Sequence, residues 1–251
     1  MSSRCWNKPF IVFGVFFPLL ASGCAGVGLH PPTKVTTAST VTAPPGEMGW
    51  WYARFRILWP EDVPPRWHMD LLLAVEVLAP VVENHRAETA LWRIHRRAAR
   101  DASGHQFSFI FYALAADAAR IYTAIRNNPL LQELEARGDI IEVVFDDVSA
   151  VRKPNLEDTS DPNWSLMLQR SWPYYIMGVS ELWLLLVTQA AESQAVGSIQ
   201  DPSAKLAFYE KVDRTVQNSW RHEAGHALLH HLNAVFEYEP LLVEPRGSLR
   251  F

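Results

Sequence analysis

The chain has 251 residues, a formal net charge of −4 at pH 7 and two cysteines. The small negative charge argues against general nucleic-acid binding, which needs a basic surface. Both cysteines, Cys5 and Cys24, lie close to the N-terminus, so the fold expected downstream carries no disulfide and depends on a buried apolar core.

The N-terminus has the features of an export signal. Arg4 and Lys8 precede an apolar run from Phe10 to Leu20, and small residues follow this run. A basic start, a short apolar segment and small residues before a break predict a secretory signal. The apolar run is shorter than the roughly 20 residues that a membrane-spanning helix needs.

The end of this signal, Leu20-Ala21-Ser22-Gly23-Cys24, resembles the lipobox of bacterial lipoproteins. The resemblance implies that residues 1–23 are a signal peptide cleaved before Cys24, and that lipid on the Cys24 thiol anchors the protein to a membrane of the cell envelope. Ala25 stands where inner-membrane lipoproteins have aspartate, which resembles the pattern for the periplasmic face of the outer membrane in a diderm bacterium. An ordinary secretory signal with an incidental cysteine is the alternative interpretation.

Residues 24–49 are rich in glycine, proline, threonine and serine and carry few charges. This composition predicts a flexible tether between the lipid and the folded part of the chain.

Residues 50–150 alternate between strand and helix patterns. Alternating or β-rich segments predict strands at 50–59, 91–99, 106–113 and 139–148, and apolar residues at helical spacing predict helices at 67–83 and 116–137. We expect Pro80 to kink or shorten the first helix, Pro129 to break the second and Gly138 to stop it. In the last strand, Ile141, Val143 and Phe145 are expected to share one face.

The order β-α-β-β-α-β predicts an α+β, ferredoxin-like domain over residues 50–150, with a four-stranded antiparallel sheet and two helices on one face. Residues 151–251 are expected to form a helical region. In it, 165–194 is one helix or two helices broken near Pro173, and a further helix runs from an N-cap at Ser203 to about Phe236.

The segment with the most specific chemistry is H-E-x-x-H, which reads His222, Glu223 and His226. On a helix the two imidazoles lie one turn apart and can bind one Zn²⁺, while Glu223 acts as general base on a metal-bound water. Residues 222–227 resemble the zinc helix of membrane-anchored AAA-type metalloproteases and of zincins generally, which implies hydrolysis of a peptide or related amide. The chain has neither a phosphate-binding loop nor the metzincin extension.

A catalytic zinc needs a third protein ligand. The candidates are Glu181 in the preceding helix and three carboxylates after the motif: Glu237, Glu239 and Glu244. His230 continues the row of histidines, but a straight helix separates it from His222 by roughly 12 Å. A chance occurrence of the motif on an amphipathic helix is the alternative, and so is an adventitious or structural metal site.

Four other features have a functional and a structural interpretation. Arg93, His95 and Arg97 on one strand can bind anions or lipid head groups, or form a solvated sheet edge. The structural interpretation is favoured for all four: the solvated edge for the basic strand, a packed core for Phe107, Phe109 and Phe111, a core helix for the aromatic residues at 172–186, and a turn cap for Asp146-Asp147.

Two functions from different classes therefore follow. The first is a lipid-anchored, zinc-dependent peptidase or amidase that uses His222, Glu223 and His226. The second is a non-catalytic lipoprotein that acts as a binding or structural module, with an envelope protein or peptide as its partner.

Overall fold

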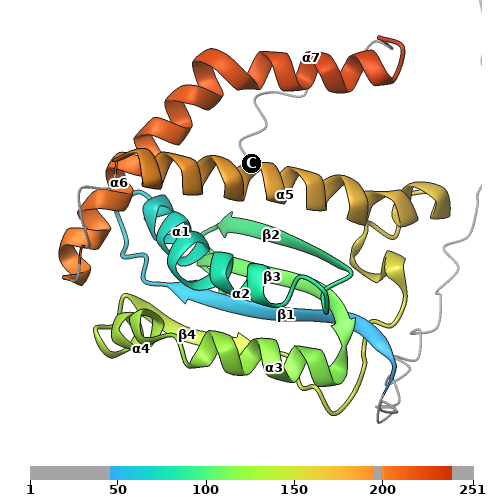
Figure 1. Cartoon of the computed structure of the whole chain (residues 1–251), viewed down its shortest axis with the longest axis horizontal. Helices are drawn as coiled ribbons and strands as arrows, with labels where there is room; N and C mark the ends of the chain where they lie inside the picture. Colours follow the sequence, from blue (N-terminus) through green and yellow to red (C-terminus); the bar gives the residue numbers. More distant parts are fainter. Residues whose placement is uncertain (1–45, 195–198, 200, 239–251) are drawn as a thin grey trace, which may run out of the picture. The chain divides into compact units, whose positions relative to one another are not determined.

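The computed structural model describes residues 46–194, 199 and 201–238, all of which belong to one compact unit of the chain. The predicted signal, Cys24 and most of the tether lie outside these residues, as do Glu239 and Glu244. The elements, labelled in Figure 1, are in chain order β1 (Met48–Ile57), α1 (Trp67–Leu73), η1 (Ala74–Leu78), α2 (Ala79–Asn84), β2 (Leu91–Ala98), β3 (His105–Leu114), α3 (Ala115–Arg126), α4 (Pro129–Ala136), β4 (Ile140–Phe145), η2 (Leu156–Thr159), α5 (Leu166–Gln194), α6 (Pro202–Ser219), η3 (Trp220–Ala224) and α7 (Gly225–Val235). η1 and η3 are π-helical turns, and η2 is a 3-10 helix.

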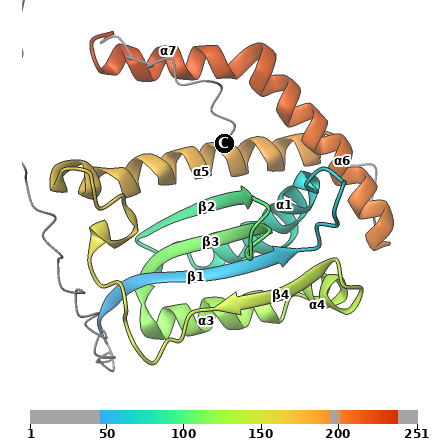
Figure 2. The same cartoon turned by 180° about the vertical axis from the view of Figure 1, so that it is seen from behind.

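The four strands form one antiparallel sheet in the order β2-β3-β1-β4, which confirms a mixed α/β chain with a four-stranded antiparallel sheet. Seen from behind in Figure 2, the strands lie in front of α1 and α3, so both helices pack on the same face. That face carries alternate residues of the central strands, as the pleat requires. The row Phe107, Phe109 and Phe111 is buried there, which confirms its predicted role in the core.

One predicted face is wrong in β4. The pairing with β1 shifts register between Arg56 and Ile57, which places an extra residue in β4. The side chain of Ile140 is buried as a result, whereas Ile141 is 53% exposed. Val143 and Phe145 still pack against the core. A β-bulge of this kind cannot be read from alternation alone, because it changes which residues face inward.

The two helix prolines are accommodated by side chains from elsewhere in the chain. A proline inside a helix leaves the carbonyl four residues earlier without its usual donor. For Pro80 this carbonyl is that of Glu76, and it accepts a hydrogen bond from Asn128 Nδ2 at 2.9 Å. For Pro173 it is the carbonyl of Gln169, which accepts a hydrogen bond from Ser160 Oγ at 2.6 Å. Pro173 therefore lies inside one continuous helix of 29 residues, α5, rather than between two.

α5 packs along β2, the edge strand of the sheet, and α6 packs against α1 and α5. Both helices add buried residues to the core of the sheet: Leu184, Val187, Ala191, Tyr209 and Val212. The aromatic residues of α5 were expected in the core, and this is wrong for Tyr174 and Tyr175, which are 62% and 46% exposed. No helix among the described residues is long and apolar enough to cross a bilayer.

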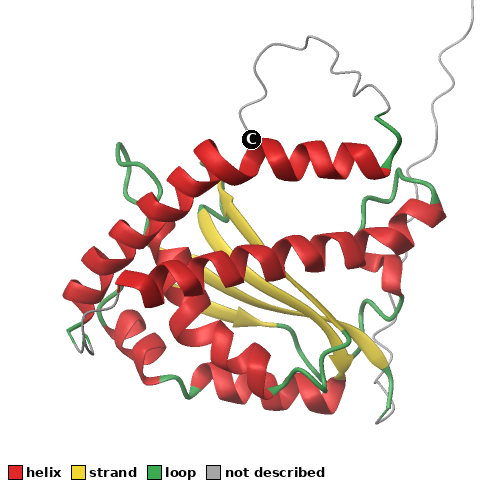
Figure 3. Ribbon diagram, turned by 45° about the horizontal axis from the view of Figure 1, so that its top comes forward, coloured by secondary structure: helices red, strands yellow, loops and turns green. Residues whose placement is uncertain are grey.

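The last helical segment differs from the straight helix expected. Asp201, not Ser203, caps α6, since its carboxylate accepts from the backbone N–H of Ala204 at 2.7 Å. At η3 the chain changes direction, and α7 runs back beside α5 on the side away from the sheet in Figures 1 and 3. Neither η3 nor α7 contains a buried residue.

Candidate functional site

The histidine motif lies across the bend between α6 and α7. His222 and Glu223 belong to η3 and His226 to the first turn of α7, and all three side chains are exposed. In η3 the backbone N–H of Gly225 donates to the carbonyl of Trp220, five residues earlier. π-turns of this type are uncommon and occur frequently at functional sites.

Gly225, the glycine within the motif, is explained by this turn. A Cβ at this position would lie 2.7 Å from the Trp220 carbonyl oxygen and 3.4 Å from its indole ring. No side chain fits without moving one of these groups. The glycine therefore serves the π-turn and the packing of Trp220, independently of any metal.

A catalytic zinc needs three protein ligands, and of the predicted ones the structure describes His222, His226, Glu181 and Glu237. Glu181 forms an ion pair with Arg86 at 3.4 Å, and Glu237 lies in the turn after α7. Within the described ranges, no group of three His, Cys, Asp or Glu side chains is arranged to hold a metal ion. The zinc ligands therefore remain a prediction.

The row of histidines continues along α7. The rings of His226 and His230 have centroids 6.0 Å apart, and the hydroxyl of Tyr238 lies 3.3 Å from Nε2 of His230. Tyr238 is 57% exposed, so this contact lies at the surface.

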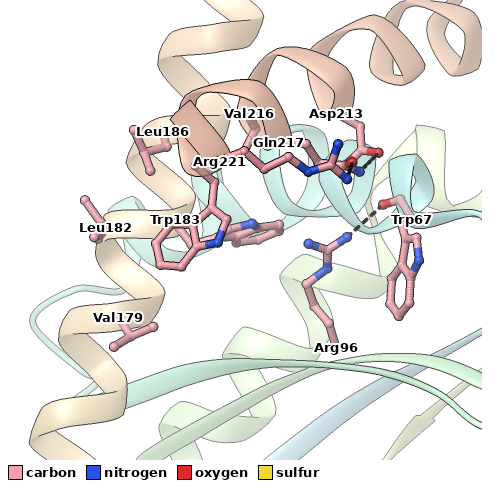
Figure 4. A pocket seen from close by; sticks show the side chains of 11 residues that line it. Trp67, Arg96, Val179, Leu182, Trp183, Leu186, Asp213, Val216, Gln217 and Arg221 are labelled. Atoms are coloured by element: carbon pink, nitrogen blue, oxygen red, sulfur yellow. Dashed lines mark hydrogen bonds between the residues drawn. The ribbon is translucent and has the colours of Figure 1, made fainter. Parts of the chain in front are cut away.

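A pocket of about 560 Å³ lies beside the motif, between α5 and the end of α6 (Figure 4). Its apolar wall consists of α5 and α6 side chains together with indole rings. Trp220 and Arg221, which line it, directly precede His222 in the sequence. Pockets of this size that combine an apolar wall with a few polar groups are typical of small-molecule sites.

The polar side of the pocket is the guanidinium of Arg96, which is held by the buried pair of Asp70 and His105. Arg96 Nε donates to Asp70 Oδ2 at 2.7 Å, and Arg96 Nη2 donates to the carbonyl of Trp67 at 3.2 Å. The other carboxylate oxygen of Asp70 lies 2.9 Å from Nε2 of His105. The side chains of Asp70 and His105 are fully buried, so the acceptor of the Arg96 guanidinium is held in one position. The guanidinium lies over the rings of Trp67 and Trp183, at 5.1 and 4.9 Å from their centroids.

A second polar group comes from α6. Asp213 accepts a hydrogen bond from Gln217 Nε2 at 2.7 Å, and Gln217 Oε1 accepts from Arg221 Nη2 at 3.5 Å. Burial raises the pKa of Asp213 above its ordinary value, although Arg96 and His68 oppose this shift. Burial also lowers the pKa of the neighbouring His68 imidazole. Burial thus shifts the protonation equilibria of both groups towards their uncharged forms.

The basic residues of β2 do not form one site. Arg97 pairs with Asp101, and Arg93 Nη2 donates to the carbonyl of Thr159 at 3.2 Å. The predicted turn cap is confirmed for Asp147, whose carboxylate accepts from the N–H and hydroxyl of Ser149 at 2.9 and 2.8 Å. Asp146 instead pairs with Arg54 at 2.9 Å.

Comparisons with protein-family models, with curated proteins and with solved structures found no match for this chain. Any proposal of a function therefore depends on the geometry of the site.

The sequence did not predict the pocket residues Arg96 and Asp213 or the buried Asp70 that holds Arg96, although a signal for Arg96 and Asp70 exists. Arg96 lies two residues after Ile94 and four after Trp92, so it shares their side of the strand, the core face. Asp70 stands among apolar residues of α1 that are all buried. One cation and one anion on facing core positions predict a buried ion pair, because an isolated buried charge is too costly.

Proposed function

We propose that this protein is a lipid-anchored, non-catalytic binding module of the cell envelope, and that its binding surface is the pocket between α5, α6 and η3. The supporting observation is the combination of an apolar wall with the fixed guanidinium of Arg96 in one pocket. The membrane attachment through Cys24 and the outer-membrane location come from the lipobox-like sequence.

We also propose that residues 50–150 have the ferredoxin-like topology. The element order β-α-β-β-α-β, the strand order β4-β1-β3-β2 and the placement of α1 and α3 on one face support this proposal.

A photo-crosslinking amino acid at Leu182 in the full chain tests the binding function. Leu182 lines the pocket, and the exposed Ile141 of β4 provides a control position away from it. We expect a discrete crosslinked species in the envelope fraction from position 182 and none from position 141. Equal labelling at both positions, or none at either, contradicts the binding module. Loss of lipid labelling in Cys24→Ser tests the anchor separately.

Zinc-dependent hydrolysis is the second proposal, and one observation favours it. His222 and Glu223 follow directly on two residues that line the pocket, so a bound substrate would lie close to the motif. Metal analysis of the full chain tests it, with His226→Ala compared with His231→Ala, a histidine outside the motif. Zinc at one ion per chain that is lost only in His226→Ala supports this second function. Substoichiometric zinc in the native protein contradicts it.

A further inference from the structure

The geometry points to a long-chain fatty acid as the ligand of the pocket between α5, α6 and η3, with its carboxylate at Arg96 and Arg221 and its alkyl chain along α5. This inference rests on the proposed binding function and adds the chemical class of the ligand.

The apolar wall is suited to an alkyl chain. Val179 and Leu182, two of the α5 residues that line the pocket, are 41% and 37% exposed, and Trp220 on the opposite side is 47% exposed. Farther along α5, Tyr175 and Leu185 are also exposed. An alkyl chain along these residues would remove apolar surface from water on the protein and on the ligand at once.

The polar end of the pocket favours an anion. Arg96 uses Nε and Nη2 in hydrogen bonds to Asp70 and Trp67, and within the described residues Nη1 has no hydrogen-bond partner. Arg221 forms no ion pair with any described carboxylate; its hydrogen bond is to the amide of Gln217. Figure 4 shows both side chains among the residues that line the pocket.

Among the residues that line the pocket, Asp213 opposes a bound carboxylate, and the carboxylate of Asp70, paired with Arg96, acts in the same direction. Asp213 faces Arg96 of β2 and His68 and Asp70 of α1, and Gln217 donates to it. Its raised pKa means that the neutral form is easier to reach than for an exposed carboxyl. A protonated Asp213 can donate a hydrogen bond to a ligand oxygen, which turns the repulsion into a contact.

A carboxylate suits the polar end of the pocket, at Arg96 and Arg221, better than an ammonium or a hydroxyl head group. Its two oxygens fit the planar fork of a guanidinium, and Arg96 is held in one orientation by Asp70. A quaternary ammonium would approach two guanidinium groups of its own charge. A neutral hydroxyl would leave Arg221 without a counter-charge.

The experiment uses the full chain in its own membranes, which avoids detergent in the pocket. Palmitic acid carrying a terminal diazirine is the probe, and labelled peptides are mapped after irradiation. Because the diazirine is at the end of the alkyl chain remote from the carboxylate, we expect labelling within α5, concentrated near Tyr175–Leu182. Arg221→Gln should reduce it about tenfold, because a charge-assisted hydrogen bond is lost. Arg214→Gln, at an exposed arginine of α6, is the control and should leave the labelling unchanged.

A second variant separates binding from the arginine chemistry. Leu182→Trp fills the pocket wall at a partly exposed position and should abolish labelling without unfolding the protein. Probes with the same chain and an alcohol or a trimethylammonium head should label the pocket at least about tenfold less, because neither can form that charge-assisted pair. A phosphate head keeps such a pair with a guanidinium and is compared directly with the carboxylate probe.

Equal labelling by the alcohol or the ammonium probe overturns the fatty-acid assignment, and so does stronger labelling by the phosphate probe. Unchanged labelling in Arg221→Gln or Leu182→Trp also overturns it. If the crosslinker at Leu182 captures a protein while the fatty-acid probe labels nothing, the binding module stands and the ligand class is wrong. If both fail, the proposed function fails as well.

Discussion

The side chain of Ser180 in α5 joins the outer edge of the sheet through Ile94. Its hydroxyl oxygen accepts from the backbone N–H of Ile94 at 3.1 Å and donates to the carbonyl of Ile176 at 2.7 Å. Edge strands expose unpaired backbone groups, which natural proteins often cover with a helix. Here one buried hydroxyl provides such a pairing for β2 and fixes the helix that forms the apolar wall of the pocket.

Replacing Ser180 with alanine should destabilise the protein by about 1–3 kcal/mol, because the N–H of Ile94 is left without a partner. Urea unfolding followed by circular dichroism measures the change. Ser171→Ala is the matched control: that hydroxyl bonds only the carbonyl of Met167 in its own helix and is exposed. A similar loss of stability in the two variants would contradict a role for Ser180 at the edge of the sheet.

The buried carboxylate of Asp70 should be far more important for stability than a surface carboxylate. Asp70→Ala leaves the Arg96 guanidinium and the Nε2 of His105 without their acceptor, so we expect a loss of about 3–5 kcal/mol. Glu142→Gln removes the partner of Arg56 from a pair that is 2.6 Å long but solvent-exposed, and should cost about 0–1 kcal/mol. Thermal and urea unfolding of both variants measure the difference, and equal losses would refute it.

Asp213→Asn should stabilise the protein in a pH-dependent manner. The pKa of Asp213 is raised from 3.8 by burial, so the native state holds this proton more tightly than the unfolded chain does. The stabilisation from the protonated form is complete below about pH 3.8 and is lost as the pH rises through the native pKa. The variant should therefore exceed the wild type in urea midpoint at pH 7.5, and the gap should close towards pH 4. A gap of constant size at every pH would indicate a packing effect instead.

Two glycines on helices should respond to alanine in opposite directions. Gly225→Ala places a Cβ against the Trp220 carbonyl, so it should destabilise η3 and change the bend between α6 and α7. Gly178→Ala meets nothing within 4 Å and should stabilise α5 by about 0.4–1 kcal/mol. Urea unfolding and the tryptophan emission of the variants are the measurements. Stabilisation by Gly225→Ala would mean that the π-turn is not required.

Structural features that depend on neighbouring residues, such as helix ends and the buried face of a strand, were predicted well from the sequence. Pro129 ends α3 and starts α4 because proline fits the first position of a helix. Gly138 has φ of 76°, a conformation that a glycine adopts without strain, and it stops α4 as expected. The spacing of Phe107, Phe109 and Phe111 at every second residue likewise predicted which face of β3 is buried. Strand alternation and turn conformation both depend only on residues that are neighbours in the chain.

Contacts between distant segments decided the rest. Asn128 and Ser160 supply, from other elements, the donors that Pro80 and Pro173 lack. Pro173 lies inside α5, whereas Pro80 lies in the first turn of α2, just after the π-turn η1. The bulge that turns Ile141 outward depends on the register with β1. The sequence by itself determined the four strands, the order of strands and helices, and the histidine motif, since each is a local pattern. Only the tertiary structure placed Asp70 under Arg96 and a pocket beside the motif, because these groups meet through the packing of α1, α5 and α6 around the sheet.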